Sequence, residues 1–329
     1  VAIAGASGFI GQAIAGPLSS AFNVVGLSRS DRDAINGFSE FRRADLFSLR
    51  DCEEALKGVD CAIYLVHSML PSARLVQGNF ADLDLLCADN FARAAKKAGV
   101  RHIVYLGGLV PISDSISQHL QSRLEVESVL AATGVPVTVL RAGLIVGAQG
   151  SSFQMVLRLV NRLPVMVCPK WTQTKMQPIA LCDVVKSIGM VVDNKNHFGK
   201  IYDLGCAEAV TYRELMEKTA KAAGVKRTFF SVPLLSPGFS RLWVTLTTGA
   251  PKELVAPLVQ SLSHEMRAEP SRKLPSLNPI SIDEMLAKGV EEARQLQIRP
   301  RAFRRPEQKK VAHTVRSVQR MSLPADRDA

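Results

Sequence analysis

The stretch VAIAGASGFIG, residues 1–11, decides the fold of this chain. The apolar run 1–4 predicts a strand, and Gly5, Gly8 and Gly11 follow it before a helical pattern begins. Gly5 permits a tight turn, Gly8 lets a pyrophosphate approach the backbone, and Gly11 lets the helix pack closely on the strand. The N–H groups at the helix start are then free to bind phosphate. We predict dinucleotide contacts from Gly5, Ser7, Gly8, Phe9, Ile10 and Gly11; the alternative is a structural turn in an α/β protein that binds no nucleotide.

Apolar, β-branched runs alternate with helical patterns through the first half of the chain. Such alternation is typical of a parallel sheet covered on both faces. Gly99 and Gly134 are placed to end helices, Asp183 to cap one, and Thr211 with Glu214 to form a capping box. Strands are predicted over 1–4, 23–27, 61–66, 103–106, 137–140 and 201–204, and helices over 11–20, 51–56, 84–98, 122–132, 183–192 and 211–223.

The alternation loosens after about residue 148, and this change divides the chain. The fold class is α/β, a Rossmann doubly wound parallel sheet with a smaller C-terminal substrate lobe. We assign residues 1–147 to an NAD(P)-binding Rossmann domain. Residues 148–293 form a mixed region that completes the sheet (about 177–224) and builds the substrate lobe. Residues 294–329 form a basic tail, extended or disordered by itself.

Most of the positive charge lies in that tail. The chain has 329 residues and a net charge of +11, which raises nucleic acid, anionic lipid or a phosphorylated ligand as partners. Residues 294–320 carry nine Lys or Arg and one acid, so the globular body is close to neutral. The tail contains one aromatic residue, Phe303, and no nucleic-acid module. It could contact a protein, an anionic membrane or nucleic acid; a solvated or partner-bound arm is favoured.

The apolar runs and the cysteines bear on the cellular compartment of the protein. No run of about 18 apolar residues predicts a transmembrane helix, and no secretory leader is recognisable. The six cysteines are scattered, with no C-x-x-C pair. We expect reduced thiols in a cytoplasmic protein, without a disulfide framework or a metal site.

The end of the second strand bears on the choice of cofactor. An NAD site has an acid there to accept from the ribose 2′-OH, whereas this chain has Ser28 and Arg29. Serine can donate to a 2′-phosphate and arginine can pair with it. We therefore prefer NADP(H), and NAD(H) stays open. Arg42 or Arg43 could supply the cation instead.

Several motifs together resemble an atypical or extended short-chain dehydrogenase/reductase. They are the glycine turn, Asp45-Leu46, LRAG at 140–143, QPIA at 177–180 and YDLG at 202–205. YLVHSM at 64–69, YLGG at 105–108 and LPVM at 163–166 resemble bacterial NAD(P)H-binding proteins related to the nitrogen metabolite repression regulators (NmrA-like). The resemblance implies that Asp45 accepts from the adenine amino group, that Leu46 lies against the ring, and that Leu65, Val66 and His67 line the cofactor.

The catalytic positions depart from the pattern of that family. The family has a Ser after the fifth strand and Tyr-x-x-x-Lys on the next helix. Here Gly107, which we count among the cofactor contacts, stands at the Ser position, His119 at the Tyr and Arg123 at the Lys. The resemblance implies that His119 is the proton donor and that Arg123 holds the ribose. His67 is a second catalytic candidate. Otherwise His119 is a surface residue and Arg123 keeps only the ribose contact.

An apolar set after the sixth strand is the candidate substrate region. The predicted substrate contacts are Phe153, Trp171 and Gln177, with Met155, Met166 and Met176 nearby. The alternative is ordinary core of a second lobe. Trp243 and the segment 233–237 could close the same pocket.

Two functions follow from these observations. The first is a reductase that uses NADPH on a small apolar carbonyl, enone or quinone-like acceptor. The second is a non-catalytic NADP(H)-sensing regulatory or binding protein, because the Ser, Tyr and Lys are all replaced. The oligomeric state is left open, since the helices at 84–98 and 122–132 could form a dimer seam that the second lobe could also prevent.

Overall fold

The structure is a computed structural model of the chain. It describes residues 1–34, 36–67, 80–111, 116–232 and 262–296, apart from the side chains of Phe80, Gln118 and His119. Trp243, the segment 233–237 and the basic tail beyond residue 296 lie outside the described residues.

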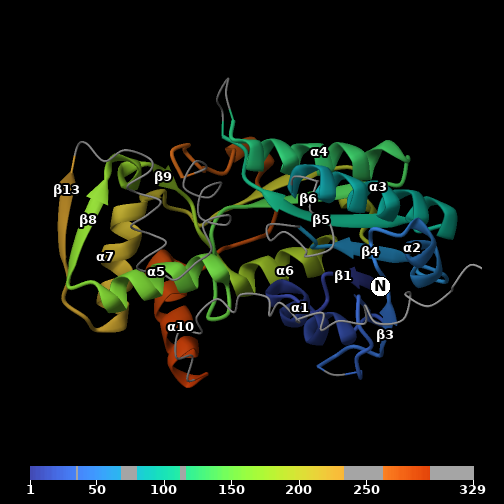
Figure 1. Cartoon of the computed structure of the whole chain (residues 1–329), viewed down its shortest axis with the longest axis horizontal. Helices are drawn as coiled ribbons and strands as arrows, with labels where there is room; N and C mark the ends of the chain where they lie inside the picture. Colours follow the sequence, from blue (N-terminus) through green and yellow to red (C-terminus); the bar gives the residue numbers. More distant parts are fainter. Residues whose placement is uncertain (35, 68–79, 112–115, 233–261, 297–329) are drawn as a thin grey trace, which may run out of the picture.

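A seven-stranded, wholly parallel sheet forms the centre of the molecule (Figure 1). Its order is β11-β6-β5-β4-β1-β2-β3, the arrangement of a doubly wound dinucleotide-binding fold. The predicted fold class is therefore confirmed. The strands are β1 Ala2–Ala4, β2 Val25–Ser28, β3 Glu40–Arg43, β4 Cys61–Tyr64, β5 His102–Gly108, β6 Val137–Ala142 and β11 Ile201–Leu204.

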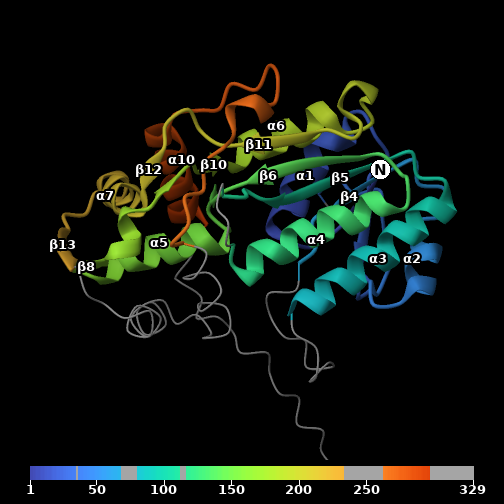
Figure 2. The same cartoon turned by 90° about the horizontal axis from the view of Figure 1, so that it is seen from above.

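Helices cover both faces of the sheet. Figures 1 and 2 show α2 (Leu49–Ala55), α3 (Phe80–Ala98) and α4 (Gln118–Ala132) on one face. The opposite face carries α1 (Phe9–Ser19) and α6 (Leu181–Val191). Each layer buries its own apolar cluster against the strands. The strands are apolar on both sides for this reason.

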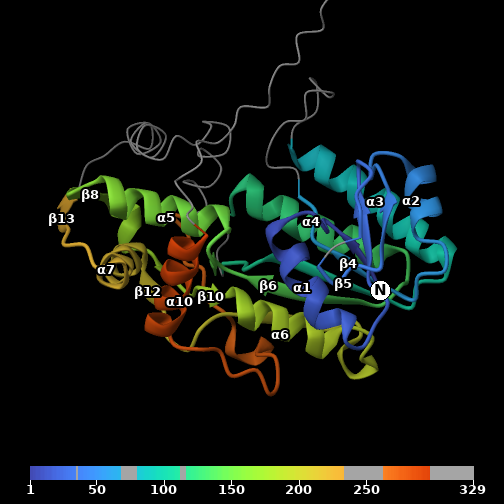
Figure 3. The ribbon, with the colours of Figure 1, turned by 90° about the horizontal axis from the view of Figure 1, so that it is seen from below.

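A second lobe is built around a third apolar cluster. Its helices α5 (Ser151–Arg162), α7 (Tyr212–Ala223) and α10 (Ile282–Gln295) lie together in Figure 3. Three pairs of short strands accompany these helices. They are β8 Val165–Pro169 with β13 Thr228–Val232, β7 Ile145–Val146 with β10 Ile179–Ala180, and β9 Lys175–Met176 with β12 Val210–Thr211. Single 3₁₀ turns complete the elements: η1 Lys170–Gln173, η2 Lys195–His197 and η3 Pro270–Arg272.

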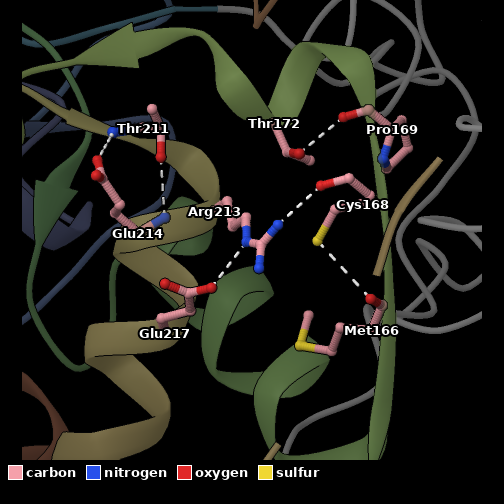
Figure 4. Close-up of polar contacts among 9 residues, drawn as sticks. Met166, Cys168, Pro169, Thr172, Thr211, Arg213, Glu214 and Glu217 are labelled. Atoms are coloured by element: carbon pink, nitrogen blue, oxygen red, sulfur yellow. Dashed lines mark hydrogen bonds and ion pairs between the residues drawn. The ribbon is translucent and has the colours of Figure 1, made fainter. Parts of the chain in front are cut away.

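Local signals set most helix ends as predicted. Gly99 and Gly134 have φ of 75° and 85°, which a residue with a Cβ rarely adopts. At α7 the Thr211 hydroxyl accepts from the Glu214 N–H at 3.0 Å, and the Glu214 carboxylate accepts from the Thr211 N–H at 2.7 Å (Figure 4). The capping box is therefore confirmed. In the same turn, Arg213 pairs with Glu217 at 2.8 Å and donates to Ser231 of β13.

Asp183 is not the helix cap that the sequence predicts. Helix α6 begins after Ala180, which places Asp183 in the first turn rather than at the N-cap. The carboxylate is fully buried and accepts from the Ile280 N–H at 2.9 Å. A long-range bond to the second lobe has replaced the local cap. Similarly, the helix predicted to start at Asp84 begins four residues earlier, at Phe80.

The described residues contain neither a candidate membrane span nor a candidate metal site. Within these ranges, no helix combines the length and the apolar character needed to cross a bilayer. The same ranges hold no group of three or more His, Cys, Asp or Glu placed to bind a metal ion.

A buried histidine network closes the amino end of the sheet. The Thr138 hydroxyl donates to the His197 carbonyl at 2.6 Å, so it must accept from His102 Nε2 at 2.8 Å. His102 Nδ1 then accepts from the Asp193 N–H at 3.2 Å. The ring is wholly buried and stacks on Phe198. Burial lowers the pKa of His102 to about 4, and the network holds the neutral imidazole.

We predict that His102 makes the fold sensitive to acid. Above about pH 6.5 the ring is neutral in both states, so its contribution to stability is complete. As the pH falls from 6.5 toward 4, the unfolded chain takes up a proton that the folded chain excludes. The free energy of unfolding then drops by on the order of 2 kcal/mol. Melting temperatures measured from pH 4.5 to 7.5 should fall less steeply for His102→Gln than for the wild type. His264→Gln is the control, and equal slopes for all three proteins would contradict the assignment.

Candidate functional site

The glycine turn after β1 has the geometry of a phosphate cradle. Gly5 has φ of 88°, and a Cβ there would lie 3.1 Å from the Leu65 side chain. A Cβ on Gly11 would meet the Gly5 carbonyl oxygen and lie 2.7 Å from the Ala6 Cα. Gly8 is the N-cap of α1 and offers no capping side chain, and the first turn contains no acid. The positive end of the helix is thus left to an anionic ligand.

Three arginines surround the end of β2. Ser28 closes the strand, and its hydroxyl accepts from Arg32 Nε at 3.2 Å. Arg43 lies opposite Ser28 in the register of β2 with β3. Arg29 and Arg43 are exposed, and no hydrogen bond or ion pair within the described residues engages either. The corner therefore offers one hydroxyl and two cations to a phosphate.

Arg42 is not available for the same task. Its guanidinium pairs with Glu40 at 2.7 Å and donates to the carbonyls of Ala55 and Lys57 at 3.0 and 2.7 Å. These bonds attach β3 to the end of α2. Of the two cations that the sequence offers as alternatives to Arg29, the structure leaves Arg43 free.

Asp45 and Leu46 follow β3 and lead into α2. The Asp45 carboxylate accepts from the Phe47 N–H at 3.2 Å, and the Leu46 carbonyl accepts from Asn90 at 3.0 Å. Both residues are partly exposed. The loop is held from two sides, so its surface at the end of the sheet is fixed before a ligand arrives.

A cavity of about 380 Å³ opens at the carboxyl edge of the sheet. Ligands of this fold class bind at that edge, where the strand order reverses. One wall comes from Ile10 and the ends of β4, β5 and β6, and the other from α5, α7 and η1. The wall is mainly apolar; its lobe side includes Met155, Val156, Leu159, Trp171, Tyr212, Leu215 and Met216.

Five of the predicted contact residues besides Ile10 line this cavity. They are Leu65, His67, Gly107, Arg123 and Trp171. Val66 packs against the core on the α2–α3 side instead.

Phe153 and Gln177 are placed elsewhere. Phe153 is fully buried in the core of the second lobe, so close to α10 that a Cβ on Gly289 would lie 2.8 Å from its ring. The Gln177 amide donates to the Cys206 carbonyl at 3.0 Å and accepts from the Ala268 N–H at 2.6 Å. Both side chains hold the lobe together rather than lining the cavity.

Gly107 has no room for the serine of the family. A Cβ there would lie 2.9 Å from the Tyr105 ring and 3.3 Å from a Glu127 oxygen. Glu127 is held in this place by Arg141, which binds both carboxylate oxygens at 2.9 and 2.7 Å. The glycine is therefore part of the packing around a buried ion pair.

Arg123, expected from the sequence to stand at a lysine position, pairs with a buried carboxylate. Its guanidinium forms an ion pair with Asp84 of α3, and both residues are almost fully buried. Nearby Tyr105 is wholly buried, and its hydroxyl has no partner in the described structure. Burial raises the pKa of Tyr105 to about 12, opposed by the charge of Arg123, so this phenol keeps its proton at neutral pH.

His119 belongs to the first turn of α4, and its side chain lies outside the described structure. The next residue, Leu120, lines the cavity.

Sequence reasoning missed Asp84, Arg32 and most of the lobe wall. On α5, residues 152, 155, 156 and 159 share one face at helical spacing, a signal that could have found part of that wall. The partners of Asp84 and Arg32 are set by tertiary packing and have no local signal.

Comparison with known proteins agrees with this geometry. Residues 5–158 match the family described as NAD(P)H-binding. Sanguinarine reductase of Eschscholzia californica is 25% identical over 248 residues, covering 62% of this chain and 88% of that protein. Auxiliary protein GraX of Staphylococcus aureus is 26% identical over 110 residues, and the match spans only 36% of its length.

Solved structures show the same architecture. The NADPH-dependent quinone oxidoreductase of Escherichia coli, solved with NADPH, aligns with a TM-score of 0.67 and 22% identity, covering 87% of this chain and 98% of its own. Triphenylmethane reductase of a Citrobacter species, solved with NADP(H), aligns with a TM-score of 0.69 and 19% identity, covering 89% and 99%. These likenesses establish the Rossmann-like fold.

We predict that Gly11 and Gly16, both on α1, respond oppositely to alanine. Gly11→Ala forces a methyl group into the backbone of the turn and should destabilise the protein by on the order of 2 kcal/mol and weaken NADPH binding. Gly16→Ala meets nothing within 4 Å and should leave stability unchanged or raise it by up to about 1 kcal/mol. Thermal melts and fluorescence titration with NADPH measure both effects. Equal losses in the two variants would refute the close approach.

Proposed function

We propose that this protein is an NADPH-dependent reductase of a small, mainly apolar acceptor with a carbonyl, enone or quinone-like group. The observation that carries the proposal is the apolar cavity that meets the glycine turn at Ile10. A cavity of this kind holds a ligand by burial, and a few polar groups orient it. In this proposal residues 1–147 hold the dinucleotide and residues 148–293 supply most of the acceptor wall.

The residues of the cradle fit an NADPH molecule. The α1 N-terminus would hold the pyrophosphate; Ser28, Arg29 and Arg43 the 2′-phosphate; and Asp45 and Leu46 the adenine. Arg123, which lines the cavity, would hold the nicotinamide ribose. When bound, NADPH supplies the hydride. The cation-rich corner favours NADPH over NADH, because no carboxylate follows β2 directly to accept from a ribose 2′-OH.

The protein's own groups would orient the acceptor and deliver a proton. The lobe side chains, with Trp171 and Met216 among them, exclude water from the reacting atoms. His67 lines the cavity and is the candidate proton donor among the described side chains. His119 stays a second candidate from the turn that precedes Leu120. Tyr105 keeps its proton, but it lies behind Gly107 rather than on the wall.

A second candidate function is NADP(H) sensing without turnover. Gly107 packs against Tyr105 and Glu127 and excludes the family serine. The family tyrosine and lysine are also replaced, and GraX is named as an auxiliary protein rather than an enzyme. Such a protein would bind NADPH in the same cradle and would not consume it.

We predict that the corner after β2 selects the 2′-phosphate. Arg29→Ala and Arg43→Ala should each raise the Kd of NADPH about tenfold, because each removes a charge-assisted hydrogen bond to phosphate. The Kd of NADH should change less than about twofold, since it has no such group. Arg93→Ala, an exposed arginine of α3, is the matched control. If the two cofactors weaken equally, the arginines do not read the 2′-phosphate.

We predict that the wild type consumes NADPH with quinones or aldehydes, followed at 340 nm. Trp171→Ala should raise the KM of an aromatic quinone about tenfold with a smaller change in kcat, because apolar contact area is lost. Trp171→Phe should keep most of the affinity. NADPH binding without turnover across a panel of quinones, enones and aldehydes would reject the reductase and favour the sensor.

A further inference from the structure

A buried ion pair stands at the wall of the cavity. Arg123 of α4 lines the cavity and pairs with Asp84 of α3. Their side chains are 6% and 2% exposed. The Arg123 Nε atom is buried and has no partner within the described structure. Arg123 is thus part of the cavity wall, whereas Asp84, which balances its charge, is not among the described residues that line the cavity.

Among the described residues, the charges at the cavity wall nearly cancel. None of the described residues that line it carries a carboxylate. Burial raises the pKa of Tyr212, on the opposite wall, far above its ordinary value, so that phenol is neutral. His67 is the other titratable group of the wall, and it lies toward the exposed rim. Arg123 is thus the permanent charge of the wall, and Asp84 cancels it.

We propose that Asp84 is a specificity-determining residue that restricts the cavity to uncharged acceptors. This inference rests on the proposed reductase function. An acceptor that carries a sulfonate or carboxylate would lose its hydration on entry and would find the cation already paired. An uncharged acceptor loses little hydration on entry and needs no countercharge from the wall. The pair therefore discriminates against anionic acceptors and in favour of uncharged ones.

Removing the carboxylate should reverse this preference. In Asp84→Asn the cation is unpaired, and an anionic acceptor supplies the missing charge. We compare 1,2-naphthoquinone with 1,2-naphthoquinone-4-sulfonate, which share a ring system. The ratio of kcat/KM for the sulfonate to that for the uncharged quinone should rise about tenfold over the wild type. Using the ratio cancels the different intrinsic reactivity of the two quinones and any general loss of activity.

Glu127→Gln is the matched control. It removes the buried carboxylate of α4, one helical turn from Arg123, and leaves Arg141 without its partner away from the cavity. The acceptor ratio should stay at the wild-type value. The double variant Asp84→Asn with Arg123→Gln has no charge at the wall and should return the ratio to within about threefold of the wild type. An unchanged ratio in folded Asp84→Asn, or an equal rise in Glu127→Gln, overturns the proposal.

Two further measurements keep the test decisive. If Asp84→Asn does not fold, Arg123→Gln removes the cation instead, and any rise in its sulfonate ratio overturns the proposal. Calorimetric binding of naphthalene-2-sulfonate and 2-acetylnaphthalene to the NADP⁺-saturated protein needs no turnover. Naphthalene-2-sulfonate should bind Asp84→Asn about tenfold more tightly than the wild type. If the affinity for naphthalene-2-sulfonate shifts but no quinone is turned over, the reductase function is rejected and the role of Asp84 stands. If quinones are turned over but the affinity does not shift, the role of Asp84 is rejected.

Discussion

The close approach of α1 to β1 is the constraint on which the site depends. Gly11 sits against the Gly5 carbonyl and the Ala6 backbone, where a Cβ has no room. Gly5 in turn lies beside Leu65, the first residue after β4. The turn is thus held between the helix and the neighbouring strand, at the point where the sheet changes its winding direction. This packing sets the position of the α1 N-terminus and of the cavity together, because Ile10 lies in the first turn of α1 and also lines the cavity.

On the face of the sheet that α3 and α4 cover, buried ion pairs lie at or beside the positions where catalytic side chains are expected. Arg141 holds Glu127 against Gly107, and Arg123 pairs with Asp84. A Cβ at 107 would lie 2.9 Å from the Tyr105 ring and 3.3 Å from a Glu127 oxygen, so the packing of α4 on β5 leaves little room for a serine side chain. Gly107→Ser would force the Tyr105 ring to move.

The sequence predicted those parts that local signals determine. Glycines with positive φ, the capping box of Thr211 and the apolar strands each depend on a few neighbouring residues. The residues whose contacts differ from the prediction depend on distant partners. Asp183 is expected to cap a helix but binds the Ile280 N–H, and Gln177 is expected to contact substrate but binds the backbone of Ala268. In the sequence, a polar residue near a helix start looks the same whether it caps the helix or binds a distant backbone group. The identity of its partner is fixed only when the second lobe packs on the sheet.

Two long-range hydrogen bonds explain how the lobe keeps its place over the cavity. Asp183 of α6 and Asp203 of β11 accept from backbone N–H groups of Ile280 and Glu269, at 2.9 and 3.0 Å. Both carboxylates are buried, and both start from elements of the central sheet and its helix layer. A buried carboxylate tolerates few alternative arrangements, since leaving it without a donor costs more than the bond itself contributes. The apolar wall is therefore positioned by polar bonds that lie outside it.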